Sequence, residues 1–304
     1  MLEKRIIDLI DFKAADLNGK GDIATDVSKI INKLNSYINQ EFSLTENEVD
    51  KYLINLGGYF STSMYIPIAP ETKFLRARPF DNQHLETKVS ELSYISKDKR
   101  NFSNMGRLNP KGVPIYYGCI YFNDIGGINV GFAEINAEAN KTVNILRSVN
   151  THYLNLYYVG IYDLVHRNCK PQFMSDEMFE KYNEVYEYQE QVFSQSAFLA
   201  HQLCDAFFSE ILRSKEYGDL YKVTSRLPTL YLEEDTIDGI IYTSVKAEGS
   251  PVVVIKTESI DSKFSHRGSD SFDILYDYGY AKYQANHTHT GTINNNKISW
   301  ISKT

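Results

Sequence analysis

The chain has 304 residues, 42% of them hydrophobic and 23% charged, which is the composition of an ordinary globular protein with a sizeable core. Its formal net charge is −7, and it contains no long basic run. Since proteins that neutralise phosphates usually carry a basic face, this charge pattern argues against nucleic acid as a partner.

The cysteine spacing and the hydropathy both favour a cytoplasmic protein. Cys119, Cys169 and Cys204 form neither a CxxC pair nor a secreted-type disulfide framework. No segment approaches the roughly 20 apolar residues that span a bilayer, and the apolar stretch at the N-terminus is too short and too charged for a signal peptide. We therefore expect no membrane partner.

The N-terminal part of the chain has the pattern of polar helices. Asp26 is placed to cap a helix over 27–40, which carries an apolar face. A second helix follows, with Ser43 or Thr45 as its cap and acidic residues in its first turn. The paired glycines at 57–58 are expected to end this helix.

From residue 74 onward the pattern changes to short strands separated by turns. The run VPIYYGCIYF at 113–122 is rich in β-branched and aromatic residues, which is typical of a core strand. Pro79 is expected to end the strand that precedes it. The elements expected in this region are strands over 74–78, 113–122, 143–146 and 154–161, and a helix over 128–139.

Residues 175–215 carry apolar side chains at helical spacing, which we interpret as the core-facing stripes of long helices. Strands return at 239–245 and 251–256, and the tail pattern predicts a terminal β-hairpin over 291–301. The nearby pair His287 and His289 has no third ligand close in sequence, so an exposed hairpin is favoured over a metal site.

Four short segments stand out through their order along the chain. They are FLRAR at 74–78, GRLNPKGVPIYYG at 106–118, FAEI at 132–135 and DGIIYTS at 238–244. Together they resemble the RES domain, a family of bacterial NAD-consuming toxins with an ADP-ribosyltransferase-like core. The resemblance covers about residues 72–258, and its most specific part is the GRxNPxGxPxxY string.

This resemblance implies roles for six residues. The catalytic ones would be Glu134, Arg76 and Ser244, and the residues that bind NAD would be Arg107, Tyr117 and Asn109. NAD would be the substrate, with no prosthetic group and no metal. Inorganic phosphate, a protein antitoxin and a second copy of the chain are the further partners that the family pattern suggests.

The chemistry of these side chains supports the same assignment. Cleavage of the bond between a cationic nicotinamide and ribose develops oxocarbenium charge, which a carboxylate such as Glu134 stabilises. Arginines such as Arg76 and Arg107 grip a pyrophosphate bidentately. An aromatic ring such as that of Tyr117 stacks on nicotinamide, and a hydroxyl such as that of Ser244 hydrogen-bonds the carboxamide or a ribose.

Several of these assignments have an alternative in a neighbouring residue. Tyr116 or Tyr121 exchanges roles with Tyr117 if the strand register is shifted. Glu138 competes with Glu134, because residues four apart share a helical face. Cys119 follows the tyrosine closely, and we expect it to be a buried strand cysteine.

We expect an α+β fold with a RES-type core of twisted sheets and flanking helices. The expected divisions are an N-terminal helical extension over 1–71, a catalytic domain over 72–260 with a helical insert at 175–215, and a C-terminal β-hairpin extension over 261–304. Both extensions are expected to pack onto the core.

The leading functional hypothesis is a NAD-consuming enzyme, toxic to its host cell, that breaks the nicotinamide–ribose bond by attack of water or of inorganic phosphate. The sequence leaves the choice of nucleophile open. A second hypothesis keeps the pocket but transfers ADP-ribose to a protein side chain, with the insert at 175–215 as the docking surface. A third is a module that binds NAD or ADP-ribose without turnover.

Overall fold

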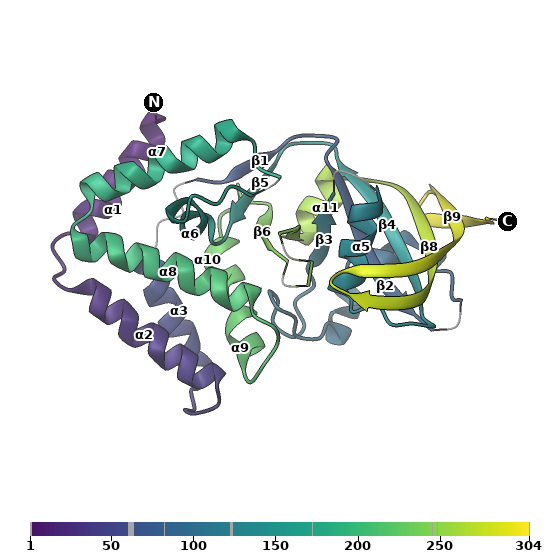
Figure 1. Cartoon of the computed structure of the whole chain (residues 1–304), viewed down its shortest axis with the longest axis horizontal. Coiled ribbons are helices and arrows are strands. Elements are labelled where there is room, and N and C mark those ends of the chain that lie inside the picture. Colours follow the sequence, from purple (N-terminus) through teal and green to yellow (C-terminus); the bar gives the residue numbers. More distant parts are fainter. Residues whose placement is uncertain are drawn as a thin grey trace. The chain divides into compact units, whose positions relative to one another are not determined.

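The chain has a mixed α+β architecture, which confirms the expected fold class (Figure 1). Its structure is a computed structural model that describes residues 2–59, 64–81, 83–121, 124–171, 173–244, 246–247 and 249–303. Among these residues, no helix combines the length and the apolar character needed to cross a bilayer.

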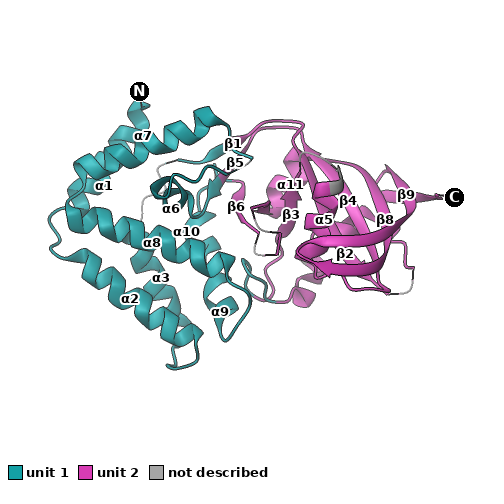
Figure 2. Ribbon diagram, viewed as in Figure 1, with its two compact units in different colours: residues 1–66, 105–110, 157–237 teal, residues 67–104, 111–156, 238–304 magenta. Residues whose placement is uncertain are grey.

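The chain divides into two compact units, coloured separately in Figure 2. Unit 1 is helical and unit 2 contains most of the sheet. This division differs from the expected boundaries at 71 and 260, because the N-terminal helices join the helical insert in unit 1 while the C-terminal strands join unit 2. Unit 1 comprises residues 1–66, 105–110 and 157–237, and unit 2 comprises residues 67–104, 111–156 and 238–304.

Unit 1 is built around the helix α8 (Gln195–Arg213), which contacts the helices on all sides of it. Its buried face includes Phe207 and Ile211 of the expected apolar stripe, whereas Leu199 is 45% exposed. The other helices of this unit are α1 (Lys4–Leu17), α2 (Ile23–Ile38), α3 (Glu46–Tyr59), α6 (Ile161–His166), α7 (Asp176–Val192), α9 (Leu220–Thr224) and α10 (Pro228–Tyr231).

The starts of α2 and α3 depend on side-chain caps. Asp22, and not Asp26, caps α2, because its Oδ1 accepts a hydrogen bond from the backbone N–H of Thr25 at 3.3 Å. Asp26 lies in the first turn, where its carboxylate interacts favourably with the positive end of the helix dipole. At α3, Thr45 Oγ1 accepts from the N–H of Glu48 at 3.3 Å and Glu48 Oε2 accepts from the N–H of Thr45 at 2.8 Å, so Thr45 is the cap.

The helix α3 ends one residue beyond the paired glycines near which its end was expected, so the glycines lie within its last turn. The helix continues through Gly57 and Gly58 to Tyr59. A Cβ on Gly57 would lie 3.0 Å from Cδ2 of Leu230, so glycine here permits close approach of α10. Tertiary packing therefore outweighs the weak helix propensity of glycine.

Within the described residues, ten strands form one sheet in the order β1-β5-β6-β7-β3-β2-β4-β8-β9-β10. From β6 to β10 along this order, neighbouring strands pair antiparallel. The strands are β1 (Ile66–Ile68), β2 (Lys73–Phe80), β3 (Tyr116–Ile120), β4 (Thr142–Asn150), β5 (Leu154–Tyr158), β6 (Gly239–Thr243), β7 (Pro251–Ile255), β8 (Phe264–Gly279), β9 (Lys282–Asn294) and β10 (Lys297–Ser302).

Two helices cover opposite faces of the sheet in unit 2. The helix α5 (Asp124–Glu134) contacts β2, β3, β4 and β9. The short helix α4 (Val89–Leu92) packs on the other face, where Val89 and Leu92 cluster with Leu146 and Ile298. The remaining helices of this unit are the 3-10 helix over Lys97–Phe102 and α11 (Thr257–Lys263).

Several expected element boundaries in unit 2 are corrected by tertiary pairing. Pro79 does not end β2, because Pro79 still pairs with Val143 of β4 and the strand continues to Phe80. The strand expected over 113–122 is confined to β3, and its residue 122 lies outside the described residues. The helix expected over 128–139 begins earlier and ends at Glu134.

The C-terminal tail forms three strands of the sheet, where only a terminal hairpin was expected. Its long strand β8 pairs with β4, and β9 and β10 extend the sheet from there. The expected strand over 154–161 is also shorter, since β5 ends at Tyr158 and α6 begins at Ile161.

Candidate functional site

The structure brings Glu134 and Ser244 together in unit 2. Glu134 is the last residue of α5, which ends where Asn136 adopts a left-handed conformation with φ 49°. Ser244 directly follows β6. The Oγ of Ser244 donates a hydrogen bond to Oε1 of Glu134. Two residues that are 110 positions apart in the sequence therefore form one polar pair.

The hydroxyl of Ser244 is oriented by the turn that follows it. Its Oγ accepts hydrogen bonds from the backbone N–H of Lys246 at 3.1 Å and of Ala247 at 2.8 Å, and the residue is 2% exposed. Because a hydroxyl has one proton and two lone pairs, these two contacts direct the proton to Glu134. Oε2 of Glu134 makes no hydrogen bond within the described part of the chain, so that oxygen is available to a ligand.

Lys246 is a residue of this site that the sequence reasoning missed. Its Nζ donates a hydrogen bond to the backbone carbonyl of Glu134 at 2.8 Å. An ammonium group at the C-terminus of α5 stabilises the helix dipole and fixes the end of the helix that carries the carboxylate. Its only signal in the sequence is its position two residues after Ser244.

The register of β3 distinguishes Tyr117 from its two competitors. A Cβ on Gly131 of α5 would lie 2.6 Å from Cδ1 of Leu75, so Leu75 faces α5. Leu75 pairs with Cys119, and side chains alternate along a strand, so Tyr117 also lies on the α5 face. Tyr116 points the other way and is completely buried. Tyr121 shares the α5 face but is buried against Gly127.

Tyr117 is thus the half-buried tyrosine on the face of the sheet that α5 covers. This placement favours Tyr117 over Tyr116 and Tyr121 as a residue that contacts a ligand. Similarly, Glu138 is exposed and lies beyond the end of α5, so it does not share a helical face with Glu134. Of the two glutamates, Glu134 is the one that Ser244 orients.

The charges of both Glu134 and Arg76 act on the thiol of Cys119. Burial raises the pKa of its thiol well above the usual range, the negative charge of Glu134 raises it further, and Arg76 opposes this shift. The side chain is 3% exposed. Cys119 therefore remains a protonated thiol and is the buried strand cysteine that the sequence indicated.

Arg76 does not pair with Glu134. It is the cross-strand partner of Leu146, which packs with α4 on the face opposite α5. Its Nη1 donates to the backbone carbonyl of Tyr117 at 2.7 Å, and its Cζ lies 5.6 Å from the centre of the Tyr116 ring. Burial lowers the pKa of Arg76. The guanidinium thus fixes β3 through a hydrogen bond to its backbone, from the face of the sheet opposite α5.

Arg107 and Asn109 belong to unit 1, whereas the other expected site residues belong to unit 2. The Nη1 of Arg107 donates to three carbonyls at the C-terminal end of α8, and its Cζ lies 5.3 Å from the centre of the Tyr221 ring. Asn109 is buried, and its Nδ2 donates to the carbonyl of Pro110 at 3.2 Å. The carbonyl acceptors of Arg107 belong to Ile211 at 3.3 Å, Leu212 at 3.1 Å and Ser214 at 2.9 Å.

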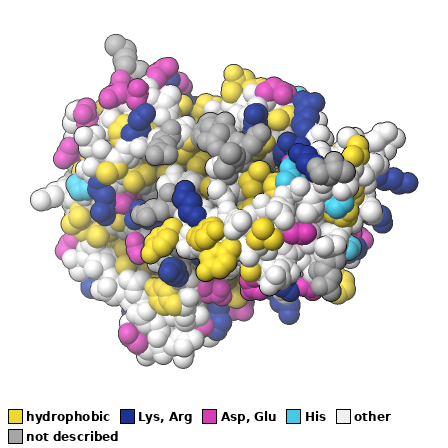
Figure 3. Space-filling view, turned by 45° about the vertical axis from the view of Figure 1, so that its right-hand side comes forward, with side chains coloured by type: hydrophobic (Ala, Val, Ile, Leu, Met, Phe, Trp, Pro, Cys, Tyr) yellow, Lys and Arg dark blue, Asp and Glu magenta, His cyan; other side chains and the backbone are white. Residues whose placement is uncertain are grey.

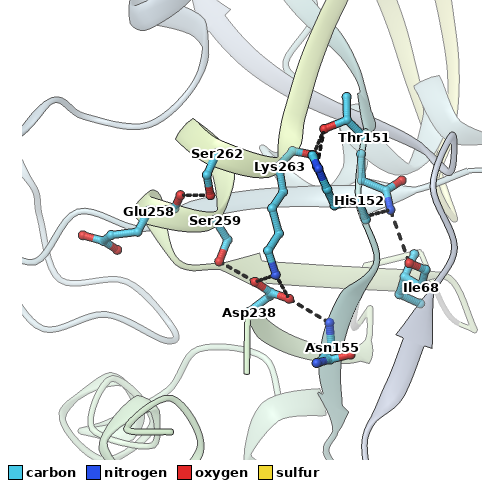
Figure 4. Close-up of polar contacts among 10 residues, drawn as sticks. Ile68, Thr151, His152, Asn155, Asp238, Glu258, Ser259, Ser262 and Lys263 are labelled. Atoms are coloured by element: carbon cyan, nitrogen blue, oxygen red, sulfur yellow. Dashed lines mark hydrogen bonds and ion pairs between the residues drawn. The ribbon is translucent and has the colours of Figure 1, made fainter. Parts of the chain in front are cut away.

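Asp238, the first residue of the DGIIYTS segment, anchors the strand that leads to Ser244 (Figure 4). The carboxylate is 2% exposed and accepts from Lys263 Nζ at 2.7 and 2.8 Å. The Oγ of Ser259 donates a hydrogen bond to this carboxylate at 2.7 Å, and the backbone N–H of Asn155 donates another at 2.8 Å. Sequence reasoning did not single out this residue, although its position at the start of the segment was a signal.

Of the two histidines of the tail, His287 has side-chain partners within the protein. Nε2 of His287 lies 3.0 Å from Oδ1 of Asp270, and its Nδ1 lies 3.1 Å from Nζ of Lys303. His289 pairs across the strands with Ser271. Among the described residues, no three histidine, cysteine or acidic side chains are grouped so as to hold a metal ion.

Comparison of the chain with protein-family models, with curated proteins and with solved structures gave no match.

Proposed function

We propose that unit 2 binds NAD and cleaves its nicotinamide–ribose bond, with Glu134 as the catalytic carboxylate. The observation that carries this proposal is the oriented pair of Glu134 and Ser244, which leaves one carboxylate oxygen available to a ligand. The half-buried Tyr117 on the α5 face adds an aromatic ring suited to stacking on nicotinamide.

The main contribution of the protein to this reaction is electrostatic stabilisation of the charge that develops on the ribose. The bond between C1 of the ribose and the nicotinamide nitrogen breaks, and its electron pair neutralises the cationic ring. Positive charge that develops on the ribose is stabilised by Glu134. An oxygen of water or of inorganic phosphate then bonds to C1, and with water a proton is released to solvent.

The contacts of the arginines change their proposed roles. Nη1 of Arg76 is engaged with the carbonyl of Tyr117, so we assign to Arg76 the positioning of β3 and not the binding of pyrophosphate. Arg107 already caps α8 within unit 1. The proposal therefore rests on Glu134, Ser244 and Tyr117.

The test is incubation of the purified chain with NAD, with and without inorganic phosphate, and separation of the products by mass. We expect nicotinamide to be released, together with ADP-ribose or its 1-phosphate. Label from the adenosine part that stays on protein would instead indicate transfer to a side chain. Intact NAD under both conditions would contradict the proposal.

The matched variants are Glu134→Gln and Glu138→Gln. The amide in Glu134→Gln still accepts the hydrogen bond from Ser244 but lacks the negative charge, so kcat should fall by roughly 10²–10³-fold with the fold retained. Glu138 is exposed and lies outside α5, so Glu138→Gln should turn over NAD at the rate of the unmodified chain. The reverse result would show that the wrong carboxylate has been chosen.

A further inference from the structure

Unit 2 contains a pocket of about 600 Å³ whose lining does not include Glu134. Phe272 packs edge-on against Phe132 of α5, with ring centres 5.5 Å apart, so its neighbour Ser271 faces away from α5. Histidine side chains are visible on the right-hand part of the molecular surface in Figure 3. The pocket is lined by Gln83, Leu85, Thr142, Ser271, Asp273, Asn286, His287, Thr288, His289, Ser302 and Lys303.

Two cross-strand rows of polar residues lie at this pocket, and all of their members except Asn144 line it. Residues paired directly across antiparallel strands share a face of the sheet. The first row is Asn144 on β4, Ser271 on β8, His289 on β9 and Ser302 on β10. The second row is Thr142, Asp273 and Asn286 on β4, β8 and β9.

The segment at 83–84 is fixed over these rows. The backbone N–H of Gln83 donates to Thr142 Oγ1 at 3.0 Å, and Asn144 Nδ2 donates to the carbonyl of His84 at 2.8 Å. Thr142 Oγ1 in turn donates to Asp273 Oδ1 at 2.8 Å. These bonds give the pocket a wall that is preformed.

Three buried polar atoms of the first row have no hydrogen-bond partner within the described ranges. They are Ser271 Oγ, His289 Nδ1 and Asn144 Oδ1, and both Ser271 and Asn144 are 0% exposed. Each such atom costs about 1–3 kcal/mol when it is left unpaired. By contrast, Ser269 on the same strand donates to the carbonyl of Ile145 at 2.6 Å. Of these three residues, Ser271 and His289 line the pocket.

The charges around the pocket favour a neutral ligand. Its charged lining residues in the described part of the chain are Asp273 and Lys303, which have opposite signs. Lys303 Nζ is held by Nδ1 of His287 at 3.1 Å. A hydroxyl group both donates and accepts hydrogen bonds, and so does the mixed set of hydroxyl, amide, imidazole and carboxylate groups that line the pocket.

We propose that this pocket binds a neutral polyhydroxylated ligand of the sugar class. Its ring hydroxyls would pair with Ser271 Oγ and His289 Nδ1, and the amide of Asn286 and the carboxylate of Asp273 would bind hydroxyls on the adjoining row. The volume lies within the range of small-molecule sites. The proposal is independent of NAD cleavage, because neither Glu134 nor Ser244 lines this pocket.

The test uses the full-length chain labelled with ¹⁵N-histidine and titrated with ribose, glucose, galactose, maltose and lactose. We expect at least one sugar to show saturable transfer of magnetisation from the protein and to shift the imidazole resonance of His289. Ser271→Ala should weaken this sugar by about tenfold, which corresponds to one lost hydrogen bond. The same variant should keep or raise Tm, because it removes an unpaired buried hydroxyl.

Two control variants separate this site from the rest of the molecule. Ser299→Ala changes an exposed serine on β10 and should leave sugar binding unchanged, as should Glu134→Gln. A pocket that holds solvent only would give no signal with any of the sugars, and the proposal would fall. It would also fall if Ser271→Ala bound the sugar as well as the unmodified chain, or if inorganic phosphate alone shifted His289.

Discussion

The hydroxyl of Ser244 connects the loop after β6 to the end of α5. It accepts from two backbone N–H groups and donates to Glu134, so all of its hydrogen-bonding capacity is used. A serine in this state is a poor nucleophile, because its lone pairs are occupied. We therefore regard Ser244 as a residue that positions the carboxylate.

Ser244→Ala should both destabilise the chain and slow NAD turnover. It leaves the N–H groups of Lys246 and Ala247 without their acceptor, so the free energy of unfolding should fall by about 1–3 kcal/mol. Chemical denaturation and kcat of the same preparation measure the two effects. Ser250→Ala is the matched control, because Ser250 contacts Ser244 through its backbone carbonyl. A stable variant with normal turnover would remove Ser244 from the site.

Substitution of Arg107 distinguishes a structural role from a ligand-binding role. Its Nη1 donates to three carbonyls at the C-terminal end of α8, where a cation also interacts favourably with the negative end of the helix dipole. Arg107→Ala should therefore lower the free energy of unfolding by about 1–3 kcal/mol. A higher KM for NAD with unchanged stability is what a pyrophosphate contact would produce instead. Lys111→Ala, at an exposed position nearby in the sequence, is the control for loss of one positive charge.

At the scale of the elements, the ion pair of Asp238 and Lys263 joins β6 to the end of α11. Asp238 also accepts from Ser259 in α11 and from the backbone of Asn155 in β5. One buried carboxylate thus connects three elements at the point where the strand toward Ser244 begins. The same network fixes the position from which β8 starts.

Lys263→Met should destabilise the chain by about 3 kcal/mol, because it leaves the buried charge of Asp238 without its counterion. Urea denaturation measures the loss. The double variant with Asp238→Asn should recover part of it, since a neutral amide replaces the unpaired carboxylate. Lys282→Met, at an exposed position on β9, controls for the loss of a lysine. Equal stability of Lys263→Met and this control would mean that the ion pair contributes nothing.

At the scale of the whole molecule, the pH dependence of stability should reflect Asp205 in the core of unit 1. Its carboxylate accepts from the N–H groups of Gly160 at 3.1 Å and Asp163 at 2.7 Å. Burial raises the pKa of Asp205 to about 7, a shift that these hydrogen bonds oppose. In the unfolded chain the carboxyl has a pKa of about 4.

Because the folded state keeps this proton and the unfolded state loses it, stability should fall as pH rises from about 4 to about 7. Burial lowers the pKa of His266, whose contribution has the opposite sign and is lost as pH falls. Asp205→Asn should therefore flatten the fall on the alkaline side, as measured by Tm at intervals from pH 4 to 8. Glu210→Gln, an exposed position on the same helix, should keep the original profile. An unchanged profile in Asp205→Asn would exclude this origin.

The local features of the chain were readable in the sequence. The long helices α7 and α8 follow from their apolar stripes, and Thr45, the cap of α3, is one of the two caps that the sequence offered. These features depend on residues within a few positions of one another. The identity of Cys119 as a buried strand residue belongs to the same group.

The faces and ends of the elements depend on contacts between distant residues. Gly57 remains helical because Leu230 packs against it, and Pro79 remains in β2 because β4 pairs with it. Sequence order alone suggested that Arg76 and Glu134 line one pocket, but strand alternation turns Arg76 away from α5. The direction of a side chain is set by the partner strand and by the helix that covers it, and only the folded chain brings these together.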